Sequence, residues 1–156
     1  MSNDMKNKNT NYAITVDDGS RRVPIMNIDG EEIGVFRFHP TDLGIIERYN
    51  RLAEKFDTIT EPLKTLHIEE GQEIDLTDPA LVDALKEAEE RLNAAVNELF
   101  GSDDAAAAFF GKMNPFSPVE GEFYATQVLQ KVGGFIGAQF DTETKAMSKR
   151  ARKYLK

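Results

Sequence analysis

The feature that most constrains this fold is a change of hydrophobic period within residues 34–50, GVFRFHPTDLGIIERYN. Residues 35–38 have the pattern of a β-strand. After them the apolar residues recur at the spacing of an α-helix, at Ile45, Ile46, Tyr49, Leu52, Ala53 and Phe56. The chain is therefore expected to pass from strand to helix at residues 39–42, and the helix is expected to end near residue 56.

His39 lies in this joint, and a histidine in a sharp turn invites a catalytic interpretation. A catalytic histidine usually works with an orienting carboxylate and a nucleophile. Asp42 is close in sequence, but the chain has no G-x-S-x-G motif. Pro40 disfavours helical backbone at His39, and Thr41 or Asp42 is a suitable helix N-cap. These local effects account for the joint without catalysis.

A β-hairpin is predicted immediately before the joint. Its arms are residues 22–28 and 32–38, and Asp29-Gly30 lies between them. Asp-Gly between apolar runs favours a tight type I′ turn, which needs positive φ. Pro24 has no N–H for a β-ladder, so its strand is expected at a sheet edge.

The residues before the hairpin divide into two parts. Residues 1–11 are rich in Asn, Lys and Ser and poor in apolar side chains, so we predict a disordered leader. Residues 12–16, YAITV, are predicted to form a short strand that ends at the turn sequence DDGS. This strand is one candidate to cover a face of the hairpin.

The clearest helix signal follows residue 77. Asp78 is a suitable N-cap, Pro79 suits the first helical position, and Gly101 suits the left-handed residue that ends a helix. The expected apolar stripe consists of Leu81, Leu85, Ala88, Leu92, Ala95, Val96 and Leu99. A shorter helix over residues 103–110, capped by Ser102, is expected next.

Two further helical segments complete the predicted fold. One covers about residues 120–139, where three glycines either allow close helix packing or introduce a kink: Gly133, Gly134 and Gly137. The other is a basic helix or tail over residues 141–156. We therefore predict one α+β domain, residues 12–156. An N-terminal β-hairpin or small antiparallel sheet in residues 12–39 is followed by a mainly α-helical remainder, residues 41–156.

Composition narrows the class of function. The formal net charge of −8 argues against a mainly nucleic-acid-binding surface, so nucleic acid is not an expected partner. The absence of cysteine excludes disulfides and thiol catalysis. No apolar run approaches the length of a membrane span, and the first residues lack the apolar core of a signal peptide. We expect a soluble, unsecreted chain without a membrane partner.

No group of residues has the spacing of a catalytic, cofactor or metal site. His67 is far from His39 in sequence, and the acidic turns at residues 17–19 and 29–32 lack the ligand pattern of a calcium loop. The glycines of residues 133–137 match no nucleotide-binding motif. We therefore predict that the chain is not an enzyme, with no catalytic residues, cofactor or metal.

The C-terminus carries the sharpest concentration of charge. Its cations are Lys145, Lys149, Arg150, Arg152, Lys153 and Lys156. They indicate either contact with nucleic acid or an acidic partner, or a solvated helix end that balances the acidic middle of the chain. We favour the solvated helix end.

Three sequence pieces together resemble a known family. They are FRFHPTD leading into a helix, the pair LFG (residues 99–101) and FFG (residues 109–111) followed by NPFS, and FYATQVLQKVGGFI. Over about residues 23–140 the chain resembles tail assembly chaperones of tailed bacteriophages and of prophages of Gram-positive bacteria. The resemblance carries over no catalytic residue.

The resemblance implies a role in tail morphogenesis through protein–protein interaction. Such chaperones bind the long, helical tape measure protein, keep it soluble, and recruit tail tube subunits around it. The implied location is the host bacterial cytoplasm, with the chain absent from the mature virion. Self-association is left open. Two alternatives also remain open: a structural tail or virion component, and a small regulator that binds nucleic acid through the basic C-terminus.

A dense group of aromatic residues is our hypothesis for the client surface. It consists of Phe109, Phe110, Phe116, Phe123 and Tyr124. Aromatic anchors are common at protein interfaces, but we favour packing in the core for most of these rings.

Overall fold

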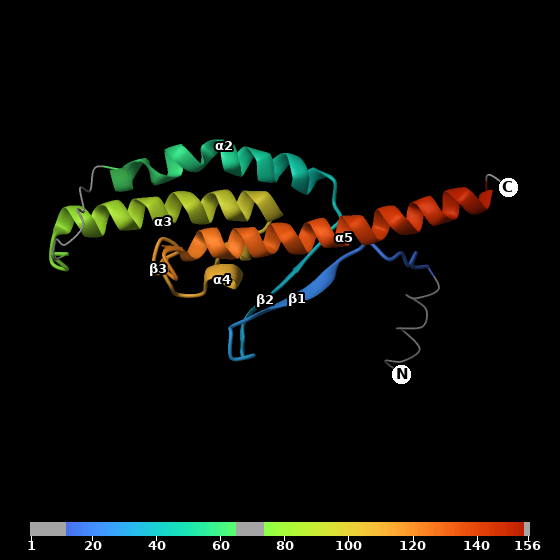
Figure 1. The fold of residues 1–156 in the computed structure, drawn as a ribbon, viewed down its shortest axis with the longest axis horizontal. Coiled ribbons are helices and arrows are strands. Elements are labelled where there is room, and N and C mark those ends of the chain that lie inside the picture. Colours follow the sequence, from blue (N-terminus) through green and yellow to red (C-terminus); the bar gives the residue numbers. More distant parts are fainter. Residues whose placement is uncertain (1–11, 65–73, 155–156) are drawn as a thin grey trace.

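A computed structural model describes residues 12–64 and 74–154 and shows an α+β arrangement, which confirms the predicted fold class (Figure 1). The predicted leader, His67 and Lys156 lie outside the described residues. The elements are β1 (Arg21–Met26), β2 (Glu32–Phe38), α2 (Gly44–Lys64), α3 (Pro79–Phe100), α4 (Ala105–Phe110), β3 (Pro118–Val119), β4 (Glu122–Phe123) and α5 (Tyr124–Tyr154).

The predicted hairpin is present as the antiparallel pair β1–β2. Its turn depends on Asn27, whose Oδ1 accepts hydrogen bonds from the N–H groups of Asp29 and Glu31 at 3.0 and 2.9 Å. Gly30 has φ of +81°, whereas Asp29 does not have positive φ. The turn is therefore not the expected type I′ turn, which requires positive φ at both central residues.

The predicted strand over residues 12–16 is wrong for this structure. Residues 13–20 form no strand, and Tyr12, Ile14 and Val16 are highly exposed. Alternating apolar residues give a strand only where another strand satisfies their backbone groups. No such strand lies beside this segment in the described part of the chain.

Helices α2 and α3 pack side by side along much of their length (Figure 1). Of the two predicted caps, Thr41 and Asp42, the structure has Asp42 at the start of α2, where its Oδ1 accepts from the N–H of Gly44 at 2.9 Å. The helix continues to Lys64, eight residues beyond the predicted end at Phe56. The apolar spacing also continues beyond Phe56. Ile59 is buried, and Leu63 packs against the core. Burial of this extended stripe accounts for the longer helix.

The predicted ends of α3 are confirmed. Asp78 accepts from the N–H of Ala80 at 3.0 Å, Pro79 begins the helix, and Gly101 ends it in the left-handed conformation with φ of 62°. The first turn of the next helix, α4, is capped by a side chain of α3. Asn97 Oδ1 accepts from the N–H of Ala106 at 2.8 Å. That bond fixes α4 to the last turn of α3.

The segment before α5 differs from the prediction. Instead of starting a helix near residue 120, the chain forms the small hairpin β3–β4. Glu120 and Gly121, with φ of 54° and 80°, make its turn. Helix α5 then runs unbroken for 31 residues. Gly133 allows close packing, since an added Cβ would lie 3.2 Å from the hydroxyl oxygen of Tyr49.

The centre of the core is a cluster of four phenylalanine rings from three elements. Phe36 and Phe38 of β2 meet Phe100 at the end of α3 and Phe109 of α4, with ring centroids 5.1 to 6.5 Å apart. Gly34 brings β2 so close to α4 that an added Cβ would overlap the carbonyl oxygen of Ala108. The cluster therefore joins the hairpin to the helices.

Candidate binding surfaces

The five predicted client residues do not form one exposed surface. Phe109, Phe110 and Phe116 are each 4% exposed and belong to the core, whereas Phe123 is 38% exposed and Tyr124 is partly buried. Three of the five residues are therefore corrected from surface anchors to core residues. Binding through Phe123 and Tyr124 stays a prediction.

A small apolar hollow lies beside α4, with a volume of about 280 Å³. It is lined by Ile33, Phe109, Phe110, Gly111, Lys112, Met113 and Tyr124. Phe110 and Tyr124 form an edge-to-face pair with centroids 6.4 Å apart, and Ile33 and Met113 are about half exposed. Because ligand pockets usually occupy about 300–1,000 Å³, this hollow suits one or two apolar side chains of a partner better than a small molecule.

A second, more polar hollow of about 260 Å³ adjoins the same loop. Phe110, Gly111, Lys112 and Met113 line both hollows, and the second adds the polar side chains Glu89, Asn93, Asn97 and Asp103. The Oδ1 atom of Asn93 is buried and has no hydrogen-bond partner. An unpaired buried acceptor is costly.

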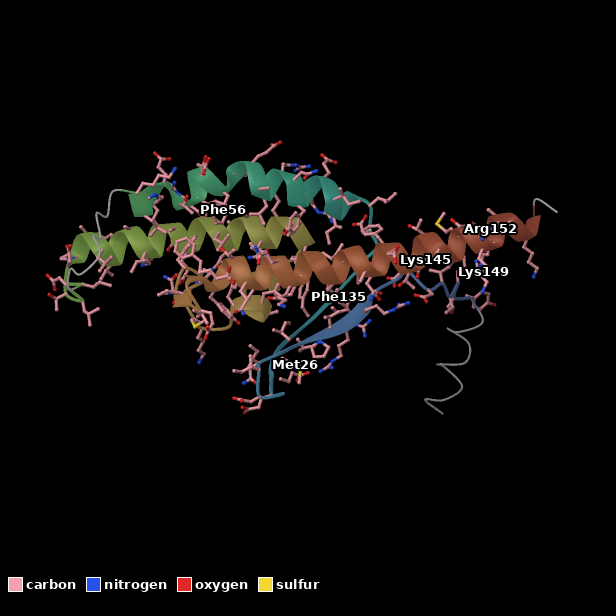
Figure 2. The ribbon with its side chains drawn as sticks, viewed as in Figure 1. Met26, Phe56, Phe135, Lys145, Lys149 and Arg152 are labelled. Atoms are coloured by element: carbon pink, nitrogen blue, oxygen red, sulfur yellow. The ribbon has the colours of Figure 1, made fainter. Side chains whose placement is uncertain are left out.

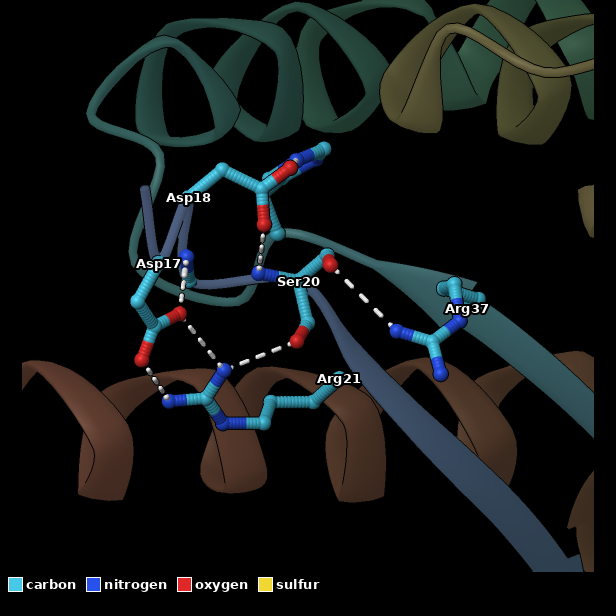
Figure 3. A network of polar contacts seen from close by, with 7 residues as sticks. Asp17, Asp18, Ser20, Arg21 and Arg37 are labelled. Atoms are coloured by element: carbon cyan, nitrogen blue, oxygen red, sulfur yellow. Dashed lines mark hydrogen bonds and ion pairs between the residues drawn. The ribbon is translucent and has the colours of Figure 1, made fainter. Parts of the chain in front are cut away.

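His39 belongs to a polar network between the N-terminal segment and the β–α joint. Its Nε2 lies 2.9 Å from Asp18 Oδ2, and Asp18 Oδ1 accepts from the N–H of Ser20 at 2.9 Å. Figure 3 shows the adjoining contacts, in which Arg21 pairs with Asp17 and Arg37 donates to Ser20 Oγ. Since the serine hydroxyl pairs with Arg37 and not with the imidazole, the nucleophile–base contact of a catalytic triad is missing.

The hydrogen bond from His39, followed by those from Ser20, holds the pKa of Asp18 well below its ordinary value. A pKa that is lower in the folded chain means that the ionised carboxylate favours folding above the ordinary pKa. This contribution is lost as the pH falls toward the folded-state pKa.

We expect His39→Ala to raise the pKa of Asp18 toward its ordinary value, because the largest cause of the shift is removed. An NMR titration of the Asp18 carboxyl carbon measures this change. His39→Gln is the matched control, since its amide keeps a hydrogen-bond donor and should retain part of the shift. Equal titration curves for the original chain and His39→Ala would show that the network does not act on Asp18.

The basic end of α5 extends past α2 and α3 (Figure 2). Residues 141–153 are all exposed, and Lys145 pairs with Asp141 at 2.9 Å. No ion pair of the described residues involves Lys149 or Arg152. The charge pattern expected from the sequence is thus present on an exposed helix.

The described residues define a small α+β protein with apolar and polar hollows and no buried charged side chain. Within residues 12–64 and 74–154, no cluster of three or more potential metal-binding side chains occurs. None of the helices in that part is both long and apolar enough to cross a membrane. Comparison with protein-family models, curated proteins and solved structures gave no match.

Proposed function

We propose that this chain is a tail assembly chaperone, which binds the tape measure protein and recruits tail tube subunits in the bacterial cytoplasm. The observation that carries the proposal is the apolar hollow beside α4. The FFG piece of the resemblance, residues 109–111, lines this hollow. In the proposal, the chaperone leaves before the tail is complete.

The hollow suits a helical client. An amphipathic helix binds a groove by inserting apolar side chains spaced three or four residues apart. One such side chain would contact Ile33, Met113 and Tyr124, and a polar neighbour on the client would lie over the adjoining polar hollow. The net charge of −8 would keep the loaded complexes apart in solution.

Met113→Asp tests the hollow directly. Met113 is 40% exposed, so the substitution should leave the fold intact while placing a charge in the proposed apolar contact. Loss of one buried apolar anchor should weaken binding to an immobilised tape measure segment roughly 10- to 100-fold. Binding is measured by titration, with circular dichroism as the check on folding.

The matched control is Met147→Asp, the same substitution at an exposed methionine of α5. It should leave client affinity unchanged. If Met113→Asp binds as tightly as the original chain, or if both variants lose affinity equally, the hollow is not the client site.

A nucleic-acid-binding regulator is the second candidate, favoured by the exposed cations of α5. Binding through those cations would weaken steeply with salt and would not depend on Met113. Client binding through the apolar hollow would depend on Met113 and would change little with salt. The titration of Met113→Asp at two salt concentrations therefore separates the two functions.

A further inference from the structure

We propose that residues 12–16 act as a donor strand, which pairs with the free edge of β2 in a second copy of this chain. A reciprocal exchange of these segments would give a closed two-fold dimer. This inference concerns self-association and does not depend on the proposed client.

The donor segment has the side-chain pattern of a strand without its partner. Tyr12 and Ile14 are each 92% exposed and Val16 is 73% exposed, so three apolar side chains at two-residue spacing face solvent. No backbone hydrogen bond of the described residues involves residues 12–18. Such a segment is suited to β-augmentation, in which an extended chain adds to an exposed sheet edge.

The polar network explains why the segment does not pair with its own hairpin. Asp17 accepts from the N–H of Gly19 and pairs with Arg21 (Figure 3). Asp18 bonds to His39, the residue that directly follows β2. These contacts fix the conformation of the turn. The preceding residues 12–16 make no backbone hydrogen bond to another described residue, which suits them to pair with the sheet edge of another molecule.

The acceptor is present in the same chain. Within residues 12–64 and 74–154 the β1–β2 sheet has two strands, so each strand has one edge that pairs with no described strand. Two-stranded sheets are marginally stable. Pro24 removes a backbone donor from β1, which makes its edge a poor acceptor. The β2 strand contains no proline. The exposed Val35 and Ile33 of β2 offer apolar contacts to the incoming side chains.

A second copy is the occupant favoured by these observations, because one chain supplies both the unpaired strand and the unpaired edge. The donor residues 12–16 carry no charge, so they meet no like charge on β2. Each copy can give one strand and receive one. When the exchange between two copies is reciprocal, the contacts are saturated at two chains.

Sedimentation equilibrium of the purified full chain tests the proposal. We expect a monomer–dimer equilibrium, and we expect Ile14→Asp to raise the dissociation constant roughly 10- to 100-fold by removing a buried apolar contact. Ile14 has no packing role within the monomer, so the variant should fold normally. Met147→Asp is the control and should dimerise like the original chain. A monomeric original chain, or a dimer unaffected by Ile14→Asp, overturns the proposal.

Cross-linking identifies the edge. The chain has no cysteine, so an introduced cysteine supplies the only thiol that can react with a maleimide. We expect a short bis-maleimide to join Thr15→Cys on one copy to Arg37→Cys on a differently tagged copy. Thr15→Cys mixed with Lys149→Cys should give no product. Cross-linking to Arg22→Cys on β1 in place of Arg37→Cys would overturn the assignment to β2.

Discussion

Replacement of Phe109 by alanine is expected to lower the free energy of unfolding by about 3–5 kcal/mol. The ring is 4% exposed and contacts the rings of Phe36, Phe38 and Phe100, at centroid distances of 5.4, 6.5 and 5.1 Å. Its removal would leave a cavity where the hairpin, α3 and α4 meet. Urea denaturation followed by circular dichroism measures the change.

Phe123→Ala is the matched control, because Phe123 is 38% exposed and has one ring partner, Phe116, at 5.3 Å. Its loss should cost well under half as much as the loss of Phe109. If both variants unfold at nearly the same urea concentration as the original chain, Phe109 is not part of a packed core.

Gly34→Ala is expected to destabilise the chain by about 1–3 kcal/mol, the usual range for overpacking. An added methyl group would overlap the carbonyl oxygen of Ala108, which is backbone and cannot rotate away. Either β2 or α4 must shift, and both hold the phenylalanine cluster. Thermal and urea unfolding should both detect this effect.

Gly134→Ala is the control with the opposite sign. Gly134 lies inside α5 with no atom close to the position of an added Cβ. Alanine should therefore stabilise the helix by about 0.5–1 kcal/mol. Equal effects of the two substitutions would mean that the approach of β2 to α4 is not tight.

Several helix ends depend on neighbouring residues and were predicted from the sequence. Asp78, Pro79 and Gly101 predicted both ends of α3, because capping involves atoms within one helical turn. Asp42 likewise predicted the start of α2. The end of α2 was predicted too early, although the apolar spacing continues through Ile59 and Leu63, which pack in the core.

The small hairpin β3–β4 was missed for a different reason. Its strands have two residues each, too few for a periodic signal. Its turn residues, Glu120 and Gly121, include a glutamate at positive φ, which is an uncommon conformation for that residue. For residues 12–16 a strand was predicted that the structure does not contain. The alternation of apolar residues indicates a strand but does not show whether another strand lies beside it.

The candidate site was only partly predictable. A cluster of aromatic residues is compatible with both burial and binding. The sequence favoured burial for most of the cluster but did not show which rings, so Phe109, Phe110 and Phe116 were included in the client-surface hypothesis although they lie in the core. The hollow requires Ile33 and Met113, which are 80 positions apart and meet only in the folded chain. No local pattern in the sequence contains that contact.

The most direct test of the chaperone proposal is the soluble fraction of the tape measure protein from the same genome, expressed with and without this chain. We predict that the tape measure protein is largely insoluble alone and becomes soluble with the chain, and that the two co-elute. Co-expression with Met113→Asp should restore less soluble protein than Met147→Asp. A soluble fraction that is the same with and without the chain, and no co-elution, would contradict the proposed function.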